Sequence, residues 1–216
     1  MHCRCLLARI SVIVVLDIKC WADPDAGRTV LKLVLVDTAP AVAAALRASF
    51  GEYEEVSVLQ ASILDVAHGA VVSPANSYGY MDGGVDAAYA AFFGQQLEKR
   101  VLQTIDRDAN GMLPVGAALL VETGHARIPF LIVAPTMELP RSGDATKVFF
   151  AMAAVLNLVN RYPSKLQHVF CPGLGTGVGA VDPEHAASEM ASAYGKWKIG
   201  HHHPAAQESV EADEGS

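Results

Sequence analysis

Short apolar runs recur along the chain between polar or glycine-rich breaks. Uninterrupted apolar runs with such punctuation are typical of strands that are buried on both faces, as in a parallel or mixed sheet covered by helices. The pattern predicts six strands, at residues 31–36, 56–59, 70–73, 117–121, 130–134 and 169–171.

Longer segments with a helical period separate these runs. Residues 40–50 and 183–197 each begin with a proline, which is favoured in the first turn of a helix. Residues 85–105 carry apolar side chains at helical spacing, and Gly94 is expected to divide them into two helices. Residues 147–161 are apolar nearly all round, which predicts a helix buried on several sides. Strands alternating with helices place the chain in the α/β class.

The N-terminal residues do not continue this pattern. A short apolar run at residues 10–16 is followed at once by Asp17 and Lys19, and no clean cleavage site follows. The run is too short to span a membrane and is a poor match to a signal peptide. It is either an extra strand or an extension outside the folded domain, and the turn-rich residues 23–28 favour the extension.

Three regions follow from these patterns. Residues 1–29 are assigned to a poorly defined N-terminal extension, and residues 30–199 to one domain. Residues 200–216 are polar and acidic, which predicts a disordered tail.

The charge of the chain limits the kinds of partner that it is expected to bind. With 16 basic and 23 acidic residues, the chain has a net charge of −7, which argues against a large surface for nucleic acid. A small anionic ligand remains compatible with this charge, because backbone amides hold phosphates without cationic side chains. No membrane partner is expected, and the oligomeric state is left open.

The four cysteines form neither a disulfide framework nor a zinc motif. They are therefore expected to be reduced thiols of a cytoplasmic protein, with no metal and no cofactor. Cys171 ends a strand beside a glycine-rich loop, but the sequence places no histidine to activate it. It is predicted to be a small buried thiol rather than a nucleophile.

The first of two glycine-rich loops leaves the strand at residues 70–73 and enters the next helix through Gly83 and Gly84. Glycines allow positive φ and a close approach of the backbone to a ligand, and the amides of a helix N-terminus bind anions. Asn76 and Asp86 are the polar candidates here. Asn76 is equally compatible with a turn-forming role, and Asp86 with complementing the helix dipole.

The second loop, residues 172–179, follows the strand at residues 169–171 and holds four glycines. No Gly-Lys-Ser/Thr follows, so it is not a P-loop, and its glycine spacing differs from the dinucleotide-binding fingerprint. Ligands of open α/β sheets bind at the carboxyl ends of the strands. Two such loops, each after a strand, therefore predict a cleft for a diphosphate.

Together these loops resemble the macro domain family, in its bacterial type, which includes proteins that process ADP-ribose 1″-phosphate. The resemblance covers residues 31–197 and is carried by Ser73-Pro74-Ala75-Asn76, Asp82-Gly83-Gly84-Val85-Asp86, Ile132-Val133-Ala134-Pro135-Thr136 and Gly175-Thr176-Gly177-Val178-Gly179. It implies a three-layer α/β/α sandwich around a central mixed, largely parallel sheet.

The resemblance also implies a ligand, ADP-ribose. Asn76 would contact the distal ribose, with Asp86 beside it, and these two would be the catalytic residues of a hydrolase by positioning or activating a water. The glycines of the two loops would hold the diphosphate from both sides. The implied ligand-binding residues are Ser62, Ile63, Ala75, Asn76, Gly83, Gly84, Val85, Asp86, Pro135, Gly173, Gly175, Thr176, Gly177, Val178 and Gly179.

Three positions depart from the family pattern. Ser62 stands where an aspartate usually binds the adenine amino group, which predicts weaker adenine binding or a relaxed base preference. Gly179 stands where an aromatic side chain usually covers the ribose. Asp82 replaces a glycine and is expected to point to solvent. Tyr78 and Tyr80 either shield the ligand in place of the missing aromatic or pack beneath the loop.

Three functions are compatible with these residues. The first is an enzyme that hydrolyses ADP-ribosyl bonds in proteins, or bonds in acetyl or phospho derivatives of ADP-ribose. The second is a sensor that binds free or protein-linked ADP-ribose without turnover. The third is a structural or phage-associated protein that uses the fold as a scaffold.

Overall fold

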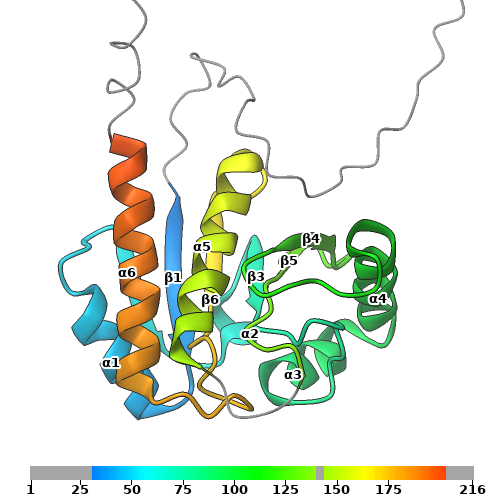
Figure 1. Cartoon of the computed structure of the whole chain (residues 1–216), viewed down its shortest axis with the longest axis horizontal. Helices are drawn as coiled ribbons and strands as arrows, with labels where there is room; N and C mark the ends of the chain where they lie inside the picture. Colours follow the sequence, from blue (N-terminus) through cyan, green and yellow to red (C-terminus); the bar gives the residue numbers. More distant parts are fainter. Residues whose placement is uncertain (1–30, 140–143, 203–216) are drawn as a thin grey trace, which may run out of the picture.

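The computed structural model describes residues 31–139 and 144–202 of the chain (Figure 1). The predicted N-terminal extension lies outside the described residues, as does the predicted tail from residue 203 onward. The closing helix continues to His202, so the first three residues assigned to the tail are helical instead. Glycine at position 200 does not end the helix, because no positive φ occurs there to turn the chain.

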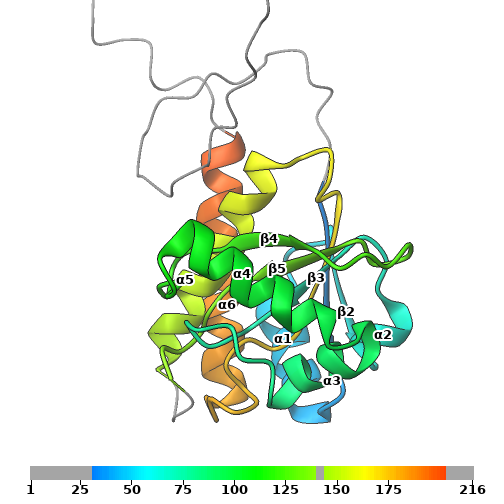
Figure 2. The same ribbon diagram turned by 90° about the vertical axis from the view of Figure 1, so that its right-hand side faces the viewer.

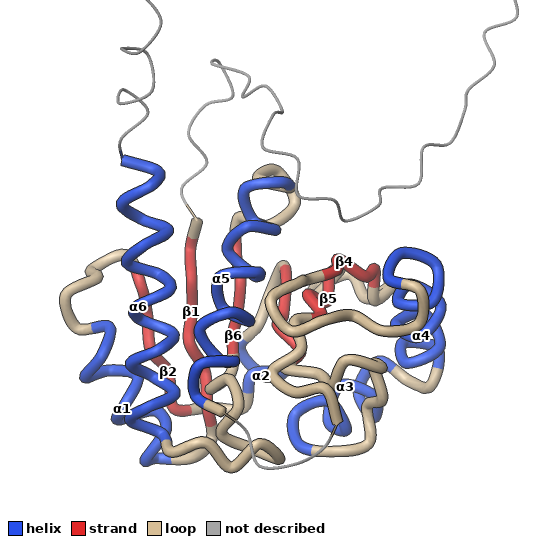
Figure 3. The backbone as a smooth tube through the Cα atoms, viewed as in Figure 1, coloured by secondary structure: helices blue, strands red, loops and turns tan. Residues whose placement is uncertain are grey.

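A six-stranded sheet forms the middle layer (Figure 3). Its order is β2-β1-β6-β3-β5-β4, and all neighbours are parallel except the antiparallel pair β4 and β5. The predicted mixed, largely parallel sheet is therefore confirmed. The strands are β1 (Lys32–Asp37), β2 (Val56–Gln60), β3 (Ala70–Ser73), β4 (Leu119–Glu122), β5 (Phe130–Val133) and β6 (His168–Cys171).

Helices cover both faces of this sheet and bury one core on each (Figure 1). Helices α1, α5 and α6 share one core, and α2, α3 and α4 share the other. In β3, Ala70 and Val72 pack into the first core and Val71 into the second, so both faces are apolar. The helices are α1 (Pro40–Phe50), α2 (Ile63–Val66), α3 (Gly84–Phe93), α4 (Gln96–Ala109), α5 (Ala145–Arg161) and α6 (Pro183–His202).

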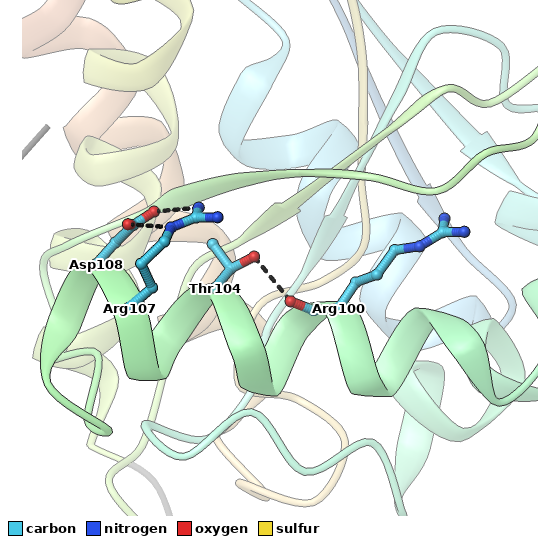
Figure 4. A network of polar contacts seen from close by, with 4 residues as sticks. All are labelled: Arg100, Thr104, Arg107 and Asp108. Atoms are coloured by element: carbon cyan, nitrogen blue, oxygen red, sulfur yellow. Dashed lines mark hydrogen bonds and ion pairs between the residues drawn. The ribbon is translucent and has the colours of Figure 1, made fainter. Parts of the chain in front are cut away.

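Helix α4 lies across the sheet in Figure 2. It packs on the sheet through one apolar stripe. Leu97, Val101 and Ile105 are buried at helical spacing, while its outer face carries polar contacts such as that between Arg107 and Asp108 (Figure 4). Exposed ion pairs of this kind add little to stability. The predicted division at Gly94 is confirmed, because this residue has a φ of 84° between the two helices.

The strand order determines where a site forms. Strands β1, β6 and β3 are parallel neighbours, so the segments that follow them open at the same edge of the sheet, which is the lower edge in Figure 1. None of the helices in the described parts of the chain combines the length and apolarity that crossing a membrane requires.

Candidate functional site

A cleft of about 600 Å³ opens at this edge of the sheet. Segments after β1, β2, β3, β5 and β6 line it, and all the predicted ligand-binding residues except Pro135 are among them. Pro135 is buried and does not reach the cleft; the following Thr136 and Met137 line it instead. The segment after β5 therefore reaches the cleft through Thr136 and Met137 rather than through Pro135.

The first lip of the cleft, residues 74–86, is fastened from within by Asn76. Asn76 Oδ1 accepts hydrogen bonds from the backbone N–H of Tyr78 (3.0 Å) and of Tyr80 (3.4 Å). Asn76 Nδ2 donates to the Tyr80 carbonyl oxygen at 3.0 Å. Most of the carboxamide is thus engaged with its own loop, which supports the turn-forming interpretation and leaves one N–H for a ligand.

Neighbouring elements brace the same lip from outside. The backbone N–H of Ser77 donates to the Met137 carbonyl oxygen at 3.0 Å, after β5. On the other side, Glu98 of α4 accepts a hydrogen bond from the Met81 N–H at 3.0 Å. The loop is therefore a rigid part of the domain rather than a free connection.

Asp86 lies in the first turn of α3 and is buried at the wall of the cleft. The Ser73 hydroxyl donates a hydrogen bond to Asp86 Oδ1 at 2.6 Å. One turn later, buried Tyr89 donates to the Val72 carbonyl oxygen at 3.1 Å and fixes the helix on β3. Burial raises the pKa of Asp86 to about 7, against the lowering effect of the Ser73 hydrogen bond, and the charge of Asp82 raises it further.

Gly83 and Gly84 bring the first lip against the second. Gly84 has a φ of 56°, which favours glycine, whereas Gly83 is extended. A Cβ at Gly83 would lie 3.1 Å from Val178 Cγ2, so glycine there permits the close approach of the two lips. Asp82 is exposed, as expected, at the mouth of the cleft.

The second lip, residues 172–179, is shaped by the absence of side chains. A Cβ at Gly173 would collide with Val42, and one at Gly179 would lie 2.7 Å from the Gly175 carbonyl oxygen. Gly175 itself has a φ of 74°. At Gly177, in contrast, a Cβ would meet nothing within 4 Å. Packing or conformation thus accounts for three of the four glycines, while the fourth faces open space.

Tyr80 supplies an aromatic surface from the first lip. Its side chain lines the cleft and is 53% exposed, and its ring stacks on that of Tyr78 with centroids 6.4 Å apart. Of the two tyrosines that the sequence left open, Tyr80 lines the cleft and Tyr78 does not. Gly179 has no room for an aromatic side chain, because its backbone packs against Gly175.

Sequence reasoning did not identify Asp37 as a site residue. It is the last residue of β1 and lines the cleft. The available signal was the rule that ligands bind at the carboxyl ends of parallel strands, since Asp37 directly follows an apolar run. The charged side chains that line the cleft in the described part of the chain are Asp37, Asp82 and Asp86. Because all three are acidic, an anion there would be held by backbone amides and uncharged side-chain donors rather than by cationic side chains.

Cys171 is completely buried, as predicted. Burial raises the pKa of its thiol far above the usual range, so the thiolate that a nucleophile requires is disfavoured. Within residues 31–139 and 144–202, no group of three or more His, Cys, Asp or Glu side chains is placed to hold a metal ion.

Sequence comparisons connect these loops to known proteins. The family model described as "Macro domain" matches residues 72–190, which begins within β3 and includes both lips. An "Uncharacterized protein" of Aquifex aeolicus is 34% identical over 145 residues, which is 67% of this chain and 83% of that protein.

Solved structures share the fold. The macrodomain of Mycobacterium tuberculosis DarG superimposes with a TM-score of 0.54 at 19% identity, over 62% of this chain and 86% of that one. A mutant Oceanobacillus iheyensis macrodomain, described as "with ADPR", gives a TM-score of 0.52 at 22% identity, over 59% of this chain and 69% of that one. These likenesses agree with the predicted three-layer α/β/α sandwich.

Proposed function

The chain belongs to the macro domain family, and from this premise we propose that its cleft binds ADP-ribose, either free or linked to a protein. The family is known for binding ADP-ribose, and the Oceanobacillus iheyensis neighbour is described with ADPR. The expected partners are thus ADP-ribose and ADP-ribosylated proteins.

The observation that carries this proposal is the pair of facing lips. Gly83 and Val178 approach each other across the cleft, and the first-turn amides of α3 have no partner within the helix. A diphosphate between the lips would accept hydrogen bonds from these amides and from those of the second lip. Carboxylates lie beyond it, with Asp86 on one side and Asp37 on the other, and both are suited to accept hydrogen bonds from ribose hydroxyls.

Calorimetric titration with ADP-ribose tests the binding. We expect heat of binding and a rise in melting temperature, because a ligand that binds only the folded state stabilises it. Adenosine, which lacks the diphosphate, is the control and is expected to bind far more weakly. Absence of heat and of a thermal shift at about 1 mM ADP-ribose would overturn the proposal and favour a fold kept as a scaffold.

We further propose that the cleft hydrolyses ADP-ribosyl esters, with Asp86 as the general base. A carboxyl group with a pKa of about 7 in a cleft is suited to proton transfer near neutral pH. Ionised Asp86 would accept a proton from water as the water oxygen bonds to the anomeric carbon of the distal ribose. The bond from that carbon to the ester oxygen breaks, and the protein carboxylate leaves with the electron pair. Asn76 holds the loop in place during this step.

Release of ADP-ribose from a protein modified on acidic residues tests this second proposal. We expect Asp86→Asn to bind ADP-ribose but to release product at least about 100-fold more slowly, the usual scale for loss of a general base. Asp65→Asn removes an exposed carboxylate outside the cleft and is the matched control. Binding by the wild type without release identifies a sensor, and equal rates in wild type and Asp86→Asn refute the assignment.

A further inference from the structure

Asp37 joins the second lip to the outer strands of the sheet. It stands in register with Gln60 of β2, and its carbonyl oxygen accepts a hydrogen bond from the Ala61 N–H at 3.1 Å. Its side chain crosses in the other direction: Asp37 Oδ2 accepts from the Gly173 N–H at 3.2 Å, at the start of the second lip. Asp37 therefore connects the glycine loop, through its carboxylate, with the segment after β2, through its backbone.

Two backbone hydrogen bonds orient this carboxylate without saturating it. Asp37 Oδ1 accepts from the Ala39 N–H at 2.9 Å, and Oδ2 accepts from Gly173. An ionised carboxylate accepts about four hydrogen bonds, so each oxygen keeps capacity for one more. A turn alone needs only the bond to Ala39, whereas the bond to Gly173 requires a second acceptor oxygen. The side chain is thus preorganised at the wall of the cleft.

The order of the strands fixes where Asp37 lies along the cleft. Strand β6 is followed outward by β1 and then by β2, so Gly173, Asp37 and Ser62 succeed one another at the edge of the sheet. In a nucleoside diphosphate whose phosphates lie between the lips, the nucleoside ribose comes next and the base after it. The ribose presents two neighbouring hydroxyls, which match two acceptor oxygens.

We propose that Asp37 binds the 2′- and 3′-hydroxyls of the nucleoside ribose and makes the cleft reject a ribose that carries a 2′-phosphate. This inference rests on the proposed binding of ADP-ribose. Acidic residues at strand ends bind ribose hydroxyls in other α/β sheets, and acceptance of a 2′-phosphate uses an arginine. No lysine, arginine or histidine side chain lines the cleft within the described residues, so a 2′-phosphate would face a carboxylate without a counter-charge.

The experiment compares ADP-ribose with its 2′-phosphate by calorimetry on the full chain. Repulsion between the phosphate and Asp37 is expected to weaken binding of the 2′-phosphate by roughly 100-fold relative to ADP-ribose. In Asp37→Asn the ratio is expected to fall below about tenfold, because ADP-ribose binds more weakly and its 2′-phosphate more tightly. Asp65→Asn makes the same change of charge on α2, outside the cleft, and is expected to keep the wild-type ratio.

The ratio of the two dissociation constants shows whether Asp37 recognises the ribose or only holds the second lip in place. If Asp37→Asn only loosens the second lip, it weakens the binding of both ligands equally and leaves the ratio unchanged. That outcome would overturn the inference. Asp37→Ser keeps an acceptor for the Ala39 N–H and is expected to lower the ratio likewise, so a fold defect in Asp37→Asn does not decide the outcome. Equal affinities in the wild type would also overturn it, whereas no affinity for ADP-ribose would defeat the proposed function itself.

Discussion

The two lips of the cleft are held in place by different interactions. The first lip is held by side chains: Asn76 binds its own loop, Ser73 binds Asp86, and Glu98 holds the backbone from α4. The second lip is held mainly by close packing at Gly173 and Gly179, where a side chain would collide with its neighbours, together with a hydrogen bond from the Gly173 N–H to the Asp37 side chain. The first lip is therefore sensitive to loss of polar groups, and the second to added side-chain atoms at Gly173 and Gly179.

This difference separates positions that affect binding from positions that affect folding. In the second lip, Gly177 alone among the four glycines faces open space, so a substitution there meets the ligand before it meets the protein. In the first lip, Asp86 is expected to affect both binding and folding. The burial that raises its pKa and suits it for proton transfer also makes its ionised form destabilising for the fold. Four predictions test these distinctions.

The largest expected effect is that of Gly177→Glu on affinity. A carboxylate about 4 Å from the diphosphate adds about 4 kcal/mol of repulsion near a protein surface, or roughly a thousand-fold in dissociation constant. Stability should not fall, because the new side chain begins in open space. Calorimetry and thermal unfolding measure the two quantities. Unchanged affinity would show that the second lip does not hold the diphosphate.

The next effect concerns pH and the first lip. Asp86 has a pKa of about 7 in the folded chain, against 3.8 as the ordinary value, so the folded state binds a proton that the unfolded state releases in this window. The contribution of Asp86 to the free energy of unfolding therefore falls as pH rises from about 4 to 7, by at most about 1.4 kcal/mol per pH unit.

Asp86→Asn should remove this contribution, so that its stability exceeds that of wild type increasingly up to about pH 7 and by a constant amount above it. Denaturant unfolding across the pH range measures the difference. Ser73→Ala removes a hydrogen bond that lowers the pKa and should extend the window upward. Parallel stability curves for wild type and Asp86→Asn would contradict the raised pKa.

A smaller effect distinguishes two glycines of the second lip by the same substitution. Gly179→Ala places a Cβ 2.7 Å from a backbone oxygen and should lower the free energy of unfolding by about 1–3 kcal/mol. Gly177→Ala has room and should raise it by about 0.4–1 kcal/mol through the unfolded state. Chemical denaturation measures both. Equal effects would mean that packing does not distinguish the two positions.

The smallest expected effect on affinity comes from changing Tyr80, the aromatic side chain of the first lip. Tyr80→Ala should weaken ADP-ribose binding by about 0.5–1.5 kcal/mol, while Tyr80→Phe should retain affinity, because the contact is made by the ring. Calorimetry with both variants is the measurement. A loss in Tyr80→Phe as large as in Tyr80→Ala would assign the role to the hydroxyl instead.

Much of the fold was predictable because its signals are local. Pro40 opens a helix and Gly94 divides two others, and these residues act on the backbone at their own positions. Helix α2 was missed because four residues carry no period. The start of β4 was placed two residues too early, since Ala117 and Ala118 are apolar without belonging to the strand.

Those features of the site that depend on the sequence of a single loop were predictable, and those that depend on contacts between distant segments were not. Glycine-rich lips are visible as composition, but the role of Asp37 depends on β1 lying beside β6, a neighbour 136 positions away along the chain. Likewise, the partners of the Asn76 carboxamide depend on how the loop folds back on itself. Long-range neighbours and loop conformation are the parts that a linear pattern does not contain.

Strand β6 has a consequence for how the molecule is built. It comes after every other described strand in the chain, yet it lies between β1 and β3 in the sheet. Until residue 171 has left the ribosome, the pair β1–β2 and the three strands β3, β5 and β4 share no strand hydrogen bonds, and the two edges that β6 will join stay open. Pairings this distant in sequence form slowly. The cleft is thus completed by a late step of synthesis, and the protein is exposed to misfolding or chaperones before it is competent to bind anything.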